Sequence, residues 1–285
     1  MSNSIILTRS EDEKLLEEIH ALQARIAYLT AYRDDLIYHV CPSLRAEYEE
    51  KIASLERELL GAQMDLAEKQ RIIEILQAQM NRREEPSFKQ AKSRARAEFT
   101  SYEEDLKQKA KEAEEFKEYW EKETQWSQHD LLEEHDQSAG EIKDLYRKIV
   151  KRLHPDVHPN PTEREKDLLI KAAEAYRKGD SETLRAIWDE LCGMEMPDEQ
   201  YENSEEGRKR LREQIRKLKA RLLALENEID QICSEYPYTM KNFLEDEGAV
   251  EERRRELNQQ LQTTRDIAEQ LQEYIEQLQK QMGGR

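Results

Sequence analysis

Residues 138–156 read SAGEIKDLYRKIVKRLHPD and hold, in order, a helix start, an amphipathic helix and a helix stop. Ser138 and Glu141 form a capping box, in which each side chain pairs with a free backbone amide of the first turn. Pro155 disfavours helical dihedral angles at the residue before it, so the helix is expected to end near His154. Apolar residues recur every three or four positions and share one face. That face consists of Ile142, Leu145, Tyr146, Ile149 and Leu153.

The opposite face of this helix is basic. Residues 141–153 contain five basic and two acidic side chains, although the whole chain carries a formal net charge of −17. An acidic protein that gathers positive charge on one helix face is expected to present it to an acidic partner. A solvated face without a partner is the simpler alternative for a helix that stands alone. The basic residues are Lys143, Arg147, Lys148, Lys151 and Arg152.

A proline-rich corner and a second helix follow directly. The segment HPDVHPNPTE, residues 154–163, contains three prolines and predicts a stiff, exposed loop. Thr162 can cap the next helix with Glu165 as its partner, and Gly179 is a typical helix stop, after which a further helix is expected. The two longer helices should lie antiparallel, with the corner at one end. The inner face of the second helix consists of Leu169, Ala172, Ala175 and Tyr176.

Heptad repeats occupy the N-terminal part of the chain. Apolar residues step by four and three from Leu15 to Val40 and again from Ile52 to Met80, as in a coiled coil, with Arg33 as one polar interruption. Pro42 lies between the two segments and is expected to break the helix, which favours an antiparallel hairpin. A straight continuation past Pro42 is the alternative.

The C-terminal third repeats this pattern. Leu15–Val40 matches Leu211–Tyr236 at an offset of 196 residues, and Leu55–Met80 matches Leu257–Met282 at an offset of 202. The segment EYPYTMKNFLEDEG, residues 235–248, supplies the second break. We therefore expect two related coiled-coil hairpins, one at each end of the chain. Their seams can bury apolar surface within each hairpin, between the hairpins or between chains.

The composition excludes several classes of function. Hydrophobic residues make up 37% and charged residues 38% of the chain, with only 8 glycines and 7 prolines, which is typical of long helices. The negative net charge disfavours nucleic acids and anionic lipid as partners. No apolar run is long enough to span a bilayer, no secretory signal is recognisable, and three scattered cysteines are expected to stay reduced. A cytoplasmic protein that does not bind membranes is therefore predicted.

Motifs for catalysis and for cofactor binding are missing. There is no glycine-rich phosphate loop, nucleophile elbow or zinc-protease helix. His154, Asp156 and His158 are three conceivable metal ligands, but they lack a fourth ligand and a supporting shell. Cys41 and Cys233 fall near the expected tips of the hairpins and are predicted to be ordinary thiols. The sequence thus predicts no enzyme, no metal and no cofactor.

Two patterns together resemble the J-domain family. The first, S-x-x-E-I-K-x-x-Y-R-K-I-x-x-x-x-H-P-D, runs from Ser138 to Asp156, and the second, L-x-x-A-x-x-A-Y, runs from Leu169 to Tyr176. Leu131 falls where the family has the leucine of its first helix. The aromatic residue that usually begins that helix is replaced by Gln128, and the Gly/Phe-rich linker and zinc module of full DnaJ proteins are missing. Any client handling would then fall to the coiled-coil arms.

The resemblance implies a co-chaperone that binds the ATPase domain of a DnaK-type chaperone and accelerates ATP hydrolysis, without being an enzyme itself. His154, Pro155 and Asp156 match the motif that the family requires for this stimulation. The implied J-domain core comprises Leu131 together with the nine apolar residues of the two inner faces. The family's basic docking helix matches Arg147, Lys148, Lys151 and Arg152.

The predicted fold is all-α, with a J-like helical hairpin domain between two antiparallel coiled-coil hairpins. The predicted boundaries are residues 1–84 for the N-terminal hairpin, 85–128 for a connecting helix, 129–196 for the J-like domain and 197–285 for the C-terminal hairpin. The arms are expected to serve self-association or the binding of a client or partner. Two rival interpretations are open. One is a structural scaffold whose J-like fold is no longer coupled to a chaperone, and the weaker one is nucleic-acid packaging through the basic patch at 82–96.

Overall fold

The computed structural model describes residues 11–82, 85–123, 137–156, 158, 161–192 and 205–283, without the side chains of 121–123, 137–139 and 282–283. Every regular element among these residues is helical, which confirms the predicted all-α class. Contacts divide the chain into one unit of Met1–Ser43 and Glu121–Thr239 and a second unit of Leu44–Trp120 and Met240–Arg285. The helices are α1 (Glu11–Asp35), the π-helix η1 (Leu36–Val40), α2 (Cys41–Tyr48), the π-helix η2 (Glu49–Ala53), α3 (Ser54–Asn81), α4 (Phe88–Glu123), α6 (Gln137–Leu153), α7 (Glu163–Lys178), α8 (Ser181–Cys192), α9 (Glu205–Ser234), the 3-10 helix η3 (Tyr238–Met240), α10 (Lys241–Glu245) and α11 (Glu247–Gly283).

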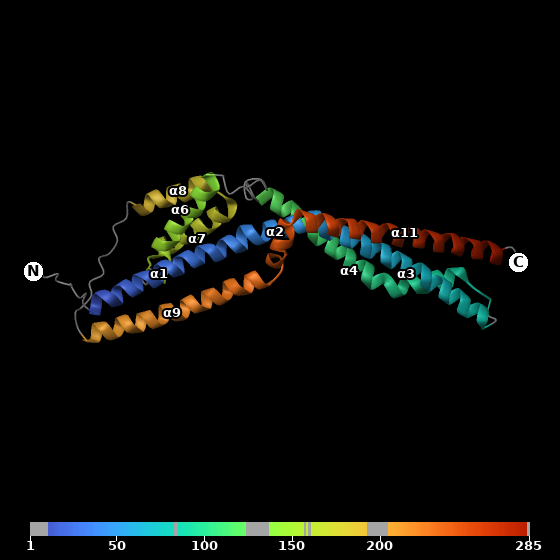
Figure 1. Cartoon of the computed structure of the whole chain (residues 1–285), viewed down its shortest axis with the longest axis horizontal. Coiled ribbons are helices and arrows are strands. Elements are labelled where there is room, and N and C mark those ends of the chain that lie inside the picture. Colours follow the sequence, from blue (N-terminus) through green and yellow to red (C-terminus); the bar gives the residue numbers. More distant parts are fainter. Residues whose placement is uncertain are drawn as a thin grey trace, which may run out of the picture. The chain divides into compact units, whose positions relative to one another are not determined.

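Helix α1 lies beside α9 in the first unit, and the two helices run in the same direction (Figure 1). Arg208 Nε is 2.7 Å from Asp12 Oδ1 near the starts of both helices. Arg33 Nη1 is 3.2 Å from Glu228 Oε2 near their other ends. Apolar heptad residues of both helices fill the interface between these ion pairs. Its buried members are Ile19, Ile26, Leu29, Leu36, Leu211, Ile215, Leu218, Leu225 and Ile229.

Helix α3 lies beside α11 in the second unit, again in parallel (Figure 1). Arg253 Nη2 and Glu56 Oε1, both near the helix starts, are 2.9 Å apart. Farther along both helices, Leu76 and Ile275 share one buried cluster, into which α4 packs through Ala91. Helix α4 occupies most of the range predicted for a connecting helix, residues 85–128.

The two predicted antiparallel hairpins are not formed. Each heptad segment packs on its own repeat from the other end of the chain, and not on the neighbouring segment. Asp12 and Arg208 are 196 residues apart, so the sequence offset between the repeats is also the register in which they pack. The predicted hairpin boundaries 1–84 and 197–285 are wrong for the same reason, because each unit combines an N-terminal with a C-terminal segment.

The N-terminal hairpin does not form because Pro42 does not end the helix. Asp35 and Cys41, on either side of η1, keep right-handed helical dihedral angles. Within η1 the Cys41 amide donates to the Leu36 carbonyl, five residues back instead of four. In a regular α-helix the proline ring clashes with the carbonyl four residues before it, and the wider π turn gives that ring room. The chain therefore stays helical through Pro42, as in the alternative to the hairpin.

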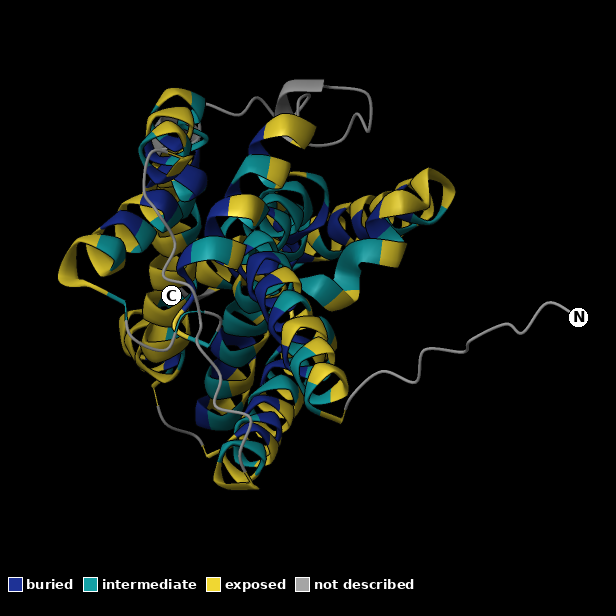
Figure 2. Cartoon of the chain, turned by 90° about the vertical axis from the view of Figure 1, so that its left-hand side faces the viewer, coloured by how far each residue is buried: buried dark blue, intermediate teal, exposed yellow. Residues whose placement is uncertain are grey.

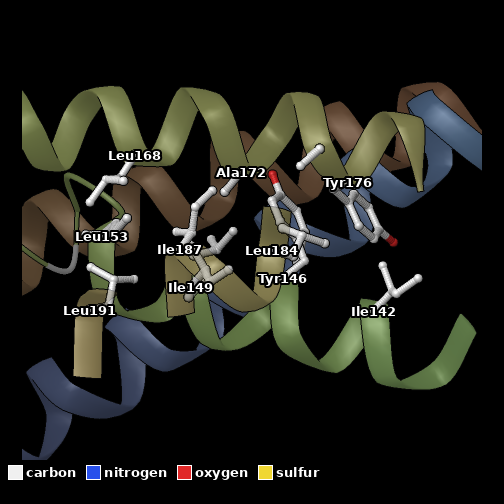
Figure 3. Close-up of a cluster of buried hydrophobic side chains, with 14 residues drawn as sticks. Ile142, Tyr146, Ile149, Leu153, Leu168, Ala172, Tyr176, Leu184, Ile187 and Leu191 are labelled. Carbon is white, nitrogen blue, oxygen red and sulfur yellow. The ribbon is translucent and has the colours of Figure 1, made fainter. Parts of the chain in front are cut away.

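Helices α6, α7 and α8 pack around one apolar cluster in the first unit (Figure 3). The capping box predicted for α7 is present, since the Glu165 amide donates to Thr162 Oγ1 at 3.2 Å. The helix ends at Gly179, whose φ of 72° lies in the left-handed region that favours glycine. Helix α6 begins at Gln137, so Ser138 lies inside it and not at the predicted cap position. Local signals thus fix both ends of α7 but not the start of α6.

Helix α1 has a second buried face, which packs against α6, α7 and α8. These three helices are called the three-helix unit below. Ala27 and Ala31 belong to the same apolar cluster as Tyr146 and Ile149. The two alanines lie off the heptad seam, and their small side chains allow α6 to approach closely. Helix α1 is consequently buried on two sides, between α9 and the three-helix unit, whereas most outer faces of the helices are exposed (Figure 2).

A buried histidine lies within η1. His39 is 2% exposed, and its ring meets that of Tyr176 edge-on, with 4.8 Å between the ring centroids. Burial lowers the pKa of His39 to about 4, although the nearby Asp35 carboxylate opposes the shift. Lys143, also nearby, lowers the pKa further. The folded protein therefore holds this imidazole neutral at ordinary pH.

We expect His39 to make the fold less stable in acid. The unfolded chain protonates this histidine below about pH 6.5, whereas the folded chain does so only near pH 4, so stability is lost as the pH falls between these values. From pH 7 to pH 5, the free energy of unfolding should fall by about 2 kcal/mol more in the natural chain than in a His39→Leu variant. Urea unfolding followed by circular dichroism measures this difference. A His20→Leu variant, changed at an exposed histidine of α1, should keep the natural pH dependence.

The seam between α1 and α9 can be tested with two leucines of the same helix. Leu225 is fully buried in the seam, whereas Leu223 is 60% exposed. Leu225→Ala should lower the free energy of unfolding by about 3 kcal/mol, because it leaves a cavity between the helices. Leu223→Ala should change it by less than about 0.5 kcal/mol. Equal losses in thermal or urea unfolding would contradict the packing of α9 on α1.

Candidate docking site

The predicted H-P-D site is the corner between α6 and α7. Helix α6 ends at Leu153, and the His154 amide donates to the Val150 carbonyl at 2.9 Å to close its last turn. The Asp156 amide then donates to His154 Nδ1 at 3.3 Å. Pro155, between them, is exposed, while His154 is only 9% exposed. The corner therefore presents its proline to solvent and covers its imidazole.

Two helices of the same unit contact this corner. From α9, Arg221 Nε lies 3.2 Å from Asp156 Oδ2. From α1, Gln23 Nε2 donates to the backbone carbonyl of Asp156 at 3.4 Å. Asp156 Oδ2 also lies 3.5 Å from His154 Nδ1. The protein's own helix pair thus contacts both the carboxylate and the carbonyl of the residue that the J-domain resemblance gives to a partner.

The surroundings of His154 favour its neutral form. Burial lowers its pKa, the positive charges of Arg221 and Arg33 lower it further, and the carboxylates of Asp156 and Asp34 oppose the shift. His154 Nδ1 accepts a hydrogen bond from the Asp156 amide, which requires that this nitrogen carry no proton. The neutral imidazole cannot balance the charge of the Asp156 carboxylate, so Arg221 is the cation that does so.

Two tyrosines fasten the three-helix unit to α1. The Tyr146 hydroxyl of α6 donates to Asp34 Oδ2 at 2.7 Å, and the Tyr176 hydroxyl of α7 donates to Asp35 Oδ1 at 2.9 Å. The two rings stack with 4.2 Å between their centroids. Burial and then the nearby aspartate charge raise the pKa of each tyrosine, so both hydroxyls stay protonated as donors. Lys143 Nζ adds an ion pair with Asp35 Oδ2 at 3.1 Å.

The basic face of α6 is divided between internal contacts and solvent. The guanidinium carbon of Arg147 lies 5.4 Å from the centroid of the Tyr28 ring of α1, a cation–π contact. Arg152 is half-buried, whereas Lys148 and Lys151 are exposed. Of the seven predicted docking residues, the exposed ones are Lys148, Lys151 and Pro155, and the partly or largely covered ones are Arg147, Arg152, His154 and Asp156.

Nine of the ten residues predicted for the J-domain core lie in one cluster or against it. The tenth, Leu131, lies outside the described residues. Leu168, which was not predicted, is buried, whereas its neighbour Leu169 is only partly buried. Helix α8 adds Leu184 and Ile187 to the same space (Figure 3). The buried predicted residues are Ile142, Tyr146, Ile149, Leu153, Ala172, Ala175 and Tyr176, and the partly buried ones are Leu145 and Leu169.

Several polar residues of this site are not predicted by the sequence patterns. All of them lie on α1 or α9, which heptad spacing alone describes as arms separate from the central helices. One signal is visible in the sequence, because Arg33 occupies a seam position where an apolar residue is expected. Arg33 pairs with Asp34, 2.7 Å away, and with Glu228. The residues missed are Gln23, Asp34, Asp35 and Arg221.

Three further features considered in the sequence can be compared with the structure: metal ligands, membrane-spanning helices and cysteines. Among the described residues, no three potential metal ligands gather in one place. None of the helices within the described ranges is long and apolar enough to cross a membrane. Cys41 and Cys233 are free thiols. Burial, and to a smaller extent the Cys233 thiol, raise the pKa of Cys41.

Comparison with known proteins adds no relative. The sequence matches no protein-family model, and neither a curated protein nor a solved structure is significantly similar to it. The resemblance to J-domains consequently rests on the sequence motifs, and the function has to be argued from the residues of the site.

Proposed function

We propose that the chain is a co-chaperone of the J-domain type, which binds a DnaK-type chaperone in the cytoplasm and accelerates its ATP hydrolysis. The supporting observation is the corner between α6 and α7, where His154, Pro155 and Asp156 follow directly on a helix with an exposed basic edge. The two helices pack side by side. Leu153 lies near Leu168 at the corner end, and Tyr146 stacks on Tyr176 farther from the corner (Figure 3), so the two helices run antiparallel.

Lys148 and Lys151 make the first contact in this proposal. Both are exposed, and their three-residue spacing puts them on the same side of α6. In a chain with a net charge of −17, such a positive edge attracts an acidic surface and speeds association at low ionic strength. Binding should weaken as salt is added, because both charges are open to solvent.

The chain supplies no covalent chemistry in this mechanism. A bound activator accelerates hydrolysis only if it binds the hydrolysis-competent conformation of the chaperone more tightly than the others. Asp156 can form charge-assisted hydrogen bonds with an arginine of the chaperone. His154 holds the backbone at Asp156 through its Nδ1 atom, so the imidazole positions the carboxylate for that contact.

The helix pairs leave little of the heptad seams for other partners. The seam residues of α1 and α3 pack against α9 and α11 of the same chain. Self-association or client binding through the arms stays a prediction, and either one would have to use the outer faces of these helices.

A structural scaffold is the second candidate, and the contact between Asp156 and Arg221 favours it. The carboxylate that docking requires is already paired within the chain at 3.2 Å. In a scaffold this pair would be permanent, and the three-helix unit would serve as a spacer on α1. The two candidates share the same fold and differ in whether a chaperone responds to the protein.

ATP turnover by the DnaK-type chaperones of the organism that encodes the chain tests the proposal. The full-length protein should raise the turnover several-fold at low salt. His154→Gln should remove the effect, because the Asp156 carboxylate loses the group that positions it. His20→Gln, on an exposed part of α1, is the matched control and should act like the natural chain.

A double charge reversal tests the basic edge in the same assay. Lys148→Glu with Lys151→Glu should raise the half-maximal concentration about tenfold or more, which corresponds to roughly 1.4 kcal/mol of binding free energy. In the same double variant, the half-maximal concentration should no longer depend on salt. If turnover responds neither to the natural chain nor to an Arg221→Gln variant, in which Asp156 loses its internal partner, the co-chaperone proposal fails and the scaffold remains.

A further inference from the structure

We propose that α1 and α9 form a clasp that closes the docking corner, with Arg221 holding the carboxylate that an arginine of the chaperone would otherwise bind. This inference rests on the proposed co-chaperone function and adds the regulation of the same site. The clasp consists of Arg221 on the Asp156 carboxylate and Gln23 on the Asp156 carbonyl. All three residues belong to the first unit.

The closed clasp weakens docking at Asp156. Asp156 Oδ2 lies 3.2 Å from Arg221 Nε and 3.5 Å from His154 Nδ1. A guanidinium group from a partner that approached this carboxylate would have to share it with Arg221, and the repulsion between the two cations would weaken its binding. The chaperone can therefore bind Asp156 fully only after Arg221 has moved away.

A chain of alternating charges holds Arg221 in place. Arg221 Nη1 lies 3.6 Å from Glu228 Oε1, and Glu228 Oε2 lies 3.2 Å from Arg33 Nη1. Arg33 Nη2 lies 2.7 Å from Asp34 Oδ1, and Asp34 Oδ2 accepts from the Tyr146 hydroxyl. Each member has a neighbour of opposite charge or a hydrogen-bond donor. The network runs from Asp156 at the corner through residues of α9 and α1 to Tyr146 in the middle of α6. Closing the clasp therefore requires that α1 and α9 be paired.

The contact that closes the clasp is weak enough for a partner to displace. The side chains of Arg221 and Asp156 are 37% and 30% exposed, so water and salt reach the pair and weaken it. A partner that offers a better-placed arginine can compete with such a contact. Lys148 and Lys151 remain exposed in the closed state, which lets an acidic partner make its first contact before Arg221 is displaced.

Arg221→Gln should open the clasp, because it removes the cation and keeps most of the side-chain length. In the chaperone assay this variant should reach half-maximal stimulation at a concentration about fivefold lower than the natural chain, or lower still. Arg210→Gln, an exposed arginine on the same helix, is the matched control and should leave the half-maximal concentration unchanged.

The chemical reactivity of His154 reports on the corner without any chaperone. Diethyl pyrocarbonate modifies accessible neutral imidazoles, and mass spectrometry of the peptide that contains His154 gives the rate. The rate should be about fivefold higher, or more, in the Arg221→Gln variant than in the natural chain. The exposed His20 in the same samples should react equally in both proteins.

The clasp proposal requires that Arg221→Gln change both the half-maximal concentration in the chaperone assay and the reactivity of His154. If the natural chain stimulates the chaperone and Arg221→Gln alters neither potency nor His154 reactivity, or alters only one of them, the clasp is overturned and the co-chaperone function stands. If the natural chain, Arg221→Gln and Arg210→Gln all leave ATP turnover unchanged, the co-chaperone function itself is overturned, and the clasp falls with it.

Discussion

The parallel packing of α1 on α9 is the interaction on which the first unit depends. It buries the heptad seam of both helices, and it decides which residues of α9 reach the far side of α1. Helix α1 meets α9 with its leucine face and α6 with an alanine face that includes Ala27 and Ala31. A shift of α9 by one heptad would displace its side chains by about 10 Å along the helix axis. Arg221 would then lie out of reach of Asp156, so the electrostatics of the corner follow from the register of the seam.

Parallel pairing also explains the order of elements along the chain. The end of one helix and the start of a parallel partner lie at opposite ends of the pair, so a short loop cannot join them. Here the connection from Asp35 to Glu205 contains α4 and the three-helix unit. The helical conformation continues past Pro42, which gives the seams of α1 and α3 no neighbour in sequence to fold back on. Their partners come from residues about 200 positions later, as with Asp12 and Arg208, and contacts of such long range slow folding because loop closure precedes their formation.

The sequence predicts the helices, the seam residues and most of the central core, since all of these depend on periodicity. It does not predict the direction of pairing, because a heptad repeat reads the same for parallel and antiparallel partners. The rule that a proline ends a helix gives the wrong expectation at Pro42, because the π turn before it accommodates the proline ring. The roles of Asp34 and Arg221 could not be predicted from the sequence, because heptad spacing describes only one face of each helix. Arg33 in the seam was the visible hint, as a charge at such a position needs a partner nearby.

The two kinds of contact between the three-helix unit and its support differ in strength. The hydroxyl of the buried Tyr146 donates to an aspartate that is itself buried, and hydrogen bonds to charged groups contribute about 1.5–3 kcal/mol each. The Asp156–Arg221 pair is partly exposed, and pairs of this kind contribute about 0.2–1 kcal/mol. A competitor for Asp156 therefore meets a weak contact at the corner and a strong one at the tyrosines. The corner can release Arg221 while the three-helix unit stays fastened to α1, so opening need not separate the helices that support it.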